Sequence, residues 1–161
     1  MNLVLIQHIL LRDLQSLRDE LLAYPNERAI WQVPQGIANS AGSLALHLAG
    51  NLQHFVGAQL GGTGYLRNRP AEFTRRDVPR AELLVEIEAA EAAVKKGLAA
   101  TREDDLPQPY PLEVGGAHPA TGSFLVHLTT HLAYHLGQVD YHRRLVTGEP
   151  HTVGALTIPQ R

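Results

Sequence analysis

Apolar side chains recur at steps of three and four over residues 2–23, which predicts an amphipathic helix with one buried face. This face contains Leu3, Ile6, Leu10, Leu14, Leu17 and Leu21. Pro25 and Asn26 follow directly and end the pattern. The first element is therefore expected to be a helix of about 22 residues.

Three further segments have the same period. Asn39 or Ser40 can cap a second helix, which ends at the Gly61-Gly62 pair. A third is expected to begin at Asp77 and Pro79, which together form a helix start, and to end near Thr101. Thr121 can cap a fourth, which runs to about Val146 before Gly148. The glycine-, proline- and arginine-rich stretch 61–80 is expected to be an ordered loop.

No segment shows convincing strand alternation, and the sequence contains no internal repeat. A chain of 161 residues has the size of one domain. Four amphipathic helices of about 20 residues favour an all-α fold, a four-helix bundle, with residues 1–161 as a single domain.

Charge and cysteine content narrow the classes of partner. The 14 basic and 16 acidic residues nearly cancel and form no block, which disfavours nucleic acid and membrane surfaces and favours a small-molecule substrate. The chain has no cysteine, so disulfides, thiolate ligands and a thiol nucleophile of its own are excluded. The apolar start lacks a cationic segment, and no run reaches the ~20 residues of a membrane span. We expect a cytoplasmic protein.

The fourth predicted helix contains histidines at residues 127, 131, 135 and 142. Two imidazoles four residues apart lie one turn apart on one helix face and can bind the same ion. His131 and His135 do so on the inward flank, whereas His127 lies further from the core. His142 lies about 10 Å along the axis from His135 and cannot share the ion.

A third ligand would have to come from another helix, and the second helix offers His47 and His54. These two are also seven residues apart, so only one of them can be a ligand. A single histidine on an apolar flank is more often a hydrogen-bonded core residue, and this is the expectation for His54, His127 and His142. The histidines near termini or in loops are expected to be solvated; they are His8, His118 and His151.

The stretches "SLALHLAGNLQHF" (43–55) and "HLAYHLGQVDYHRRL" (131–145) resemble the DinB family of metal-dependent enzymes. That resemblance implies a four-helix bundle with nickel or zinc bound by three histidines, and by position these are His47, His131 and His135. It places Gly137 and Gln138 in the same motif, and together with the apolar breadth of the first helix it implies a homodimer. The stretch "GGTGYLRNRPAEF" (61–73) also resembles one branch of the family.

Two functions follow from these expectations. The first is a metal-dependent enzyme in which the ion activates a low-molecular-weight thiol, as in an S-transferase, or water, as in a hydrolase. No glutamate follows His131, so the "HExxH" pattern of zinc peptidases is absent. The second is a stress-response protein that binds a metal or ligand without catalysis. The sequence assigns no catalytic residue and identifies neither the thiol nor the substrate.

Overall fold

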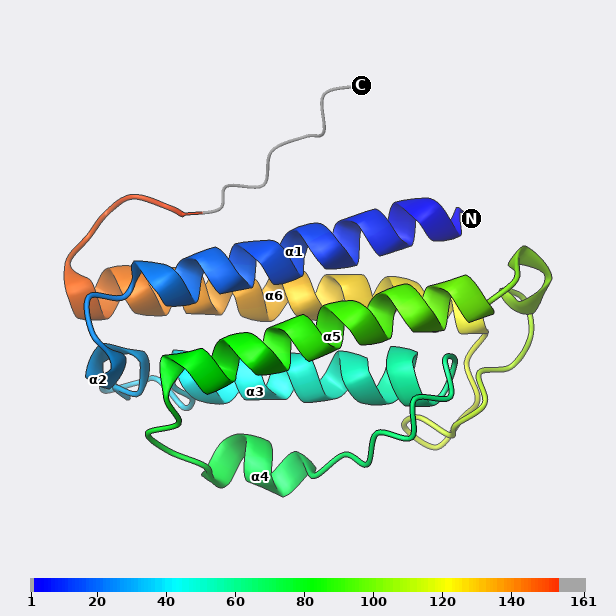
Figure 1. Ribbon diagram of the computed structural model, residues 1–161, viewed down its shortest axis with the longest axis horizontal. Helices are drawn as coiled ribbons and strands as arrows, with labels where there is room; N and C mark the ends of the chain where they lie inside the picture. Colours follow the sequence, from blue (N-terminus) through cyan, green and yellow to red (C-terminus); the bar gives the residue numbers. More distant parts are fainter. Residues whose placement is uncertain (1, 154–161) are drawn as a thin grey trace.

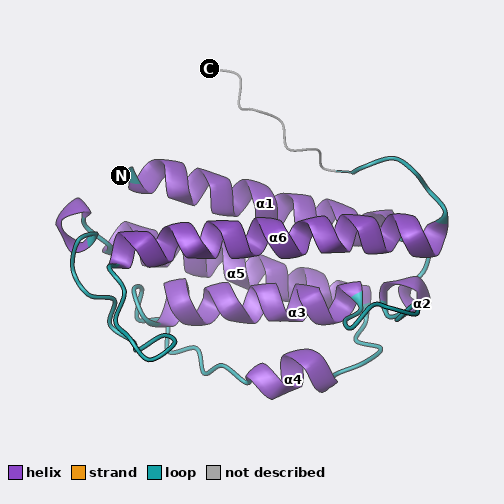
Figure 2. Cartoon of the chain, turned by 180° about the vertical axis from the view of Figure 1, so that it is seen from behind, coloured by secondary structure: helices purple, strands orange, loops and turns teal. Residues whose placement is uncertain are grey.

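The computed structural model describes residues 2–153 and shows an all-α protein (Figures 1 and 2). Within these residues there are six α-helices and no β-strand. They are α1 (Leu3–Ala23), α2 (Glu27–Ile30), α3 (Ala41–Leu52), α4 (Arg69–Thr74), α5 (Arg80–Ala100) and α6 (Thr121–Thr147). The predicted fold class is confirmed at the level of all-α.

The four long helices lie side by side, with α1 and α6 running in one direction and α3 and α5 in the other (Figure 1). Helices α1, α5 and α6 each turn an apolar stripe inward, because the 3.6-residue period places those side chains on one face. Helix α3 is different, since all of its residues are buried. Leu10 and Leu14 from α1, Ile87 from α5 and Leu132 from α6 are fully buried in the shared core. The short helix α4 lies outside this group and packs against α3 (Figures 1 and 2).

The ends of the helices refine the predicted boundaries. Ser40 caps α3, since its hydroxyl accepts a hydrogen bond from the backbone N–H of Ser43. The predicted cap at Thr121 is wrong: Thr121 is the first residue of α6, and its hydroxyl donates to the carbonyl of Gln108. Gly148 ends α6 in the left-handed conformation.

The second predicted helix changes character after Leu52. Residues Gln53–Ala58 form a π-helical segment. This segment packs tightly on α5 at Val56. A Cβ atom added to Gly97 of α5 would lie only 2.2 Å from the carbonyl oxygen of Val56. The widened turn leaves the carbonyl of Phe55 free to accept a hydrogen bond from the Tyr110 hydroxyl at 2.6 Å.

The stretch 61–80, expected to be a loop throughout, contains α4. Asn68 caps this helix through its side-chain oxygen, and Pro70 occupies its first turn. Among residues 2–153, none of the helices is both long and apolar enough to cross a membrane.

Candidate metal centre

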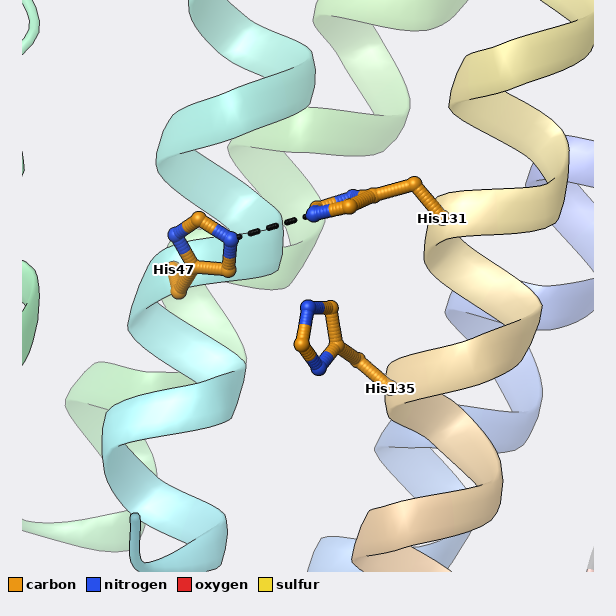
Figure 3. A group of neighbouring side chains, drawn as sticks. All are labelled: His47, His131 and His135. Atoms are coloured by element: carbon orange, nitrogen blue, oxygen red, sulfur yellow. Dashed lines mark hydrogen bonds between the residues drawn. The ribbon is translucent and has the colours of Figure 1, made fainter. Parts of the chain in front are cut away.

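Helices α3 and α6 bring three histidines together across the interior. Each of His47, His131 and His135 offers one ring nitrogen to a group in which all three atoms lie within 4.8 Å of one another. Figure 3 shows the rings converging, His47 from α3 and the other two from successive turns of α6. The Nε2 atoms of His47 and His131 are 3.2 Å apart.

The antiparallel course of α3 and α6 explains which histidines meet. Phe55 packs edge-on against Phe124, so moving back along α3 corresponds to moving forward along α6. His47 thereby falls opposite His131 and His135, with ring centroids 5.1 Å and 5.4 Å away. The spacing of four residues on α6 sets the third distance, 4.7 Å.

The environment favours neutral imidazoles, the form that binds metals. His47 is only 6% exposed, and the other two rings are partly buried. Burial, followed by the neighbouring histidines, lowers the pKa of His131 to about 4. Burial also lowers the pKa of His135. Near neutral pH, the rings of His131 and His135 are therefore uncharged, and each has a lone pair available for a metal.

Helix α4 supplies a carboxylate to the outer side of His47. The Nδ1–H of His47 donates to Oε2 of Glu72 at 2.9 Å, which leaves the lone pair of Nε2 facing the other two histidines. Arg67 donates to both carboxylate oxygens, at 2.7 Å and 2.9 Å. Burial raises the pKa of Glu72, but the hydrogen bonds from His47 and Arg67 outweigh it, so the pKa is lowered and the carboxylate stays charged.

Gln138 has the matching role on α6. Its side-chain oxygen lies 2.7 Å from Nδ1 of His135, so the ring donates there and turns Nε2 inward. Nδ1 of His131 is buried, and within residues 2–153 it has no hydrogen-bond partner. Two of the three rings are therefore held by a polar side chain behind them, as metal-binding histidines usually are.

The family described as protein of unknown function DUF1572 matches residues 4–161. The chain belongs to the DUF1572 family. No curated protein and no solved structure matches it. The matched region includes both α3 and α6, so all three histidines of this DUF1572 protein lie inside it.

The three histidines of the DUF1572 protein form a group that could hold a metal ion. Imidazole nitrogen is a common metal ligand, and a set of three such ligands leaves a further coordination position for a small molecule. The group could hold a metal with little rearrangement, because its three nitrogens already converge and two rings are fixed from behind.

The other histidines lie outside this group, as expected. His142 is buried and hydrogen-bonded, with Nδ1 2.7 Å from the Tyr24 hydroxyl and Nε2 2.8 Å from the carbonyl oxygen of Gln32. His127 is exposed and stacks on Phe124, so the expectation of a core residue is wrong there. His54 is partly buried, and within residues 2–153 its Nδ1 has no hydrogen-bond partner, so the expected hydrogen bond at this atom is not formed. The histidines expected to be solvated are all exposed; they are His8, His118 and His151.

Arg67 and Glu72 are the residues that sequence reasoning missed. Asn68 and Pro70 could have indicated a helix start, with Glu72 in its first turn. The contact of Glu72 with His47 depends on how closely α4 approaches α3. Gly50 permits this approach, since a Cβ atom there would lie 2.5 Å from Oε1 of Glu72.

Proposed function

We propose that the protein is a metal-dependent enzyme of the DinB type, a four-helix bundle in which His47, His131 and His135 bind one zinc or nickel ion. The observation that carries this proposal is the convergence of three ligand atoms within 4.8 Å. The hydrogen bonds of Glu72 and Gln138 behind two of the rings support it.

Three neutral ligands favour activation of a small nucleophile. They leave the ion its full charge, and an ion so held lowers the pKa of a bound water or thiol towards neutrality. The chain itself has no cysteine. A low-molecular-weight thiol acting on a small-molecule electrophile, as in an S-transferase, is therefore the reaction we propose, with hydrolysis by water as its variant.

One observation favours the alternative, a stress-response protein that binds a metal or ligand without turnover. Glu72 is the carboxylate behind His47, and both of its oxygens already accept hydrogen bonds from Arg67 or His47. A general base needs a free oxygen within reach of the proton that it removes. Catalysis would then depend on the ion and on the substrate's own groups.

Metal content of protein purified without an affinity tag tests the proposal. We expect one ion per chain in the wild type and a loss of stoichiometric metal in His47→Ala, His131→Ala and His135→Ala. The controls are His127→Ala and His54→Ala, which should keep their metal. A wild type that binds no zinc or nickel, or triad variants that retain it fully, would overturn the metal centre.

A thiol-dependent conjugation screen on electrophiles then separates the two functions. Turnover that requires both the metal and an added thiol supports the S-transferase, and metal binding without turnover supports the alternative. We also propose a homodimer, and a monomer mass by light scattering at micromolar concentration would contradict it.

A further inference from the structure

A cavity of about 440 Å³ lies beside the histidine group, between loop 36–39 and the second half of α6. Its size falls in the range of pockets that bind small organic molecules, about 300–1,000 Å³. The residues that matter to its chemistry are Ile37, Leu44, Gln138, Tyr141, His142 and Leu145.

The near edge of the cavity lies about one helical turn from His47 and His135, between the same two helices. Leu44 precedes His47 by three residues on α3, and Gln138 follows His135 by three residues on α6. Because α3 and α6 are antiparallel, both offsets lead in the same direction, by about 4.5 Å at 1.5 Å per residue. Gln138 belongs to both places, since it lines the cavity and holds the ring of His135.

The lining that residues 2–153 provide is mostly apolar. Within these residues, no aspartate, glutamate, lysine or arginine lines the cavity. His142 is a lining residue that could gain a positive charge, but burial lowers its pKa, and both of its ring nitrogens are engaged, by Tyr24 and Gln32. A charged ligand would lose its hydration here without gaining an opposite charge.

Part of the apolar lining faces solvent. Tyr141 is 69% exposed, Leu145 60% and Ile37 37%. A bound apolar group would remove this surface from water, which favours binding by about 25 cal/mol per Å² in small-molecule transfer data. The side-chain oxygen of Gln138 is used by His135, so its NH₂ group is the part that can donate to a ligand.

We propose that this cavity binds the uncharged, apolar part of the small-molecule substrate, with a polar oxygen of that substrate accepting a hydrogen bond from Gln138. The reacting group would then lie towards His135. The assignment of the ligand as substrate rests on the proposed function, whereas the binding of an uncharged apolar molecule does not.

A matched pair of probes tests the charge preference. 4-Fluorobenzyl alcohol and 4-fluorobenzoate have the same ring, and fluorine NMR titration reports the binding of each. We expect the alcohol to bind wild-type protein at least about tenfold more tightly than the carboxylate. Equal affinities, or tighter binding of the carboxylate, would overturn the proposal.

Two variants of α6 locate the binding site. Leu145→Glu puts a charge at the cavity, and Val126→Glu puts the same charge at an exposed apolar position, 45% exposed, that does not line it. The alcohol should bind Leu145→Glu at least about tenfold more weakly and Val126→Glu as it binds the wild type. Equal effects of the two variants would overturn the location. A dimer that only Leu145→Glu dissociates would also overturn the proposal, because the cavity would then be covered by a second copy of the chain.

Paramagnetic cobalt(II) added to the protein tests whether the probe binds close to the three histidines. If the cobalt ion binds to the three histidines, it should broaden the fluorine signal of the alcohol bound in the cavity. The variant His131→Ala should bind no ion, so the alcohol should still bind to it, but without broadening. Probe binding in a wild type that takes up no metal contradicts the proposed function and supports the cavity. Metal uptake without probe binding contradicts the cavity alone.

Discussion

Nδ1 of His47 donates a hydrogen bond to Oε2 of Glu72 over 2.9 Å, and this contact joins the core helix α3 to the outer helix α4. It fixes which nitrogen of His47 has the proton and therefore which nitrogen faces the other two histidines. Arg67 holds the carboxylate in place from the same side. The stretch 61–80 thus contributes to the histidine group without providing a ligand.

Glu72→Ala should weaken metal binding by about 10–100-fold, the usual effect of removing such a partner. The His47 ring would lose its orientation and some of its basicity. Competition with a chromophoric chelator measures the affinity. Glu88→Ala is the control, because Glu88 is an exposed glutamate on α5. Equal affinity in the two variants would show that the carboxylate has no influence on the site.

Gly50→Ala should act on the same contact by steric displacement. The added Cβ atom would lie 2.5 Å from Oε1 of Glu72, so the carboxylate or the whole of α4 must shift. We expect weaker metal binding, by about tenfold, and a free energy of unfolding lower by about 1–3 kcal/mol.

Gly137→Ala is the matched control for this substitution. Gly137 lies in α6, and apart from its chain neighbours and the backbone of its own helix no described atom would lie within 4 Å of its Cβ atom. Replacing a glycine inside a helix by alanine should raise the free energy of unfolding by about 0.5–1 kcal/mol. Chemical denaturation measures both effects, and a loss of metal affinity in Gly137→Ala would contradict the steric explanation.

Helices α1, α5 and α6 could be predicted from the sequence because each buries one face of period 3.6 in a common core. Helix α3 has apolar residues at the same period, although all of its residues are buried. The pairing of His131 with His135 followed from the same geometry, since four residues make about one turn. The spacing left the choice between His47 and His54 open, and only the resemblance to a known family favoured His47. The antiparallel alignment of α3 with α6 brings His47 to the group.

The contribution of α4 could not be predicted in the same way. Helix α4 spans only Arg69–Thr74, too short for a periodic apolar face to be recognised. Its position depends on contacts distant in sequence, such as Glu72 with His47 and the tight approach to Gly50. No local pattern encodes such contacts, and the π-helical segment after Leu52 likewise depends on packing against α5.

A buried ion pair joins α1 to α6 away from the histidines, and breaking it should lower the free energy of unfolding. The side chains of Arg143 and Glu20 are each 1% exposed and hydrogen-bonded to one another. Arg143→Ala would leave the Glu20 carboxylate buried without its partner, which costs about 3–5 kcal/mol. Arg144→Ala removes a partly exposed arginine and should cost less than about 1 kcal/mol. Similar losses in denaturant melts of the two variants would contradict this assignment.

The metal-free protein should lose stability as the pH falls from about 6.5 to about 4. Burial lowers the pKa of His131 from 6.5 to about 4, so in this range the unfolded chain binds a proton that the folded protein does not. The free energy of unfolding therefore decreases on acidification, and below pH 4 this residue causes no further loss. His131→Gln should reduce the slope by up to about one proton without abolishing it, because burial also lowers the pKa values of His135 and His142. Urea melts between pH 4 and pH 8 measure both slopes, and equal slopes in wild type and variant would mean that His131 takes up its proton equally well in the folded protein.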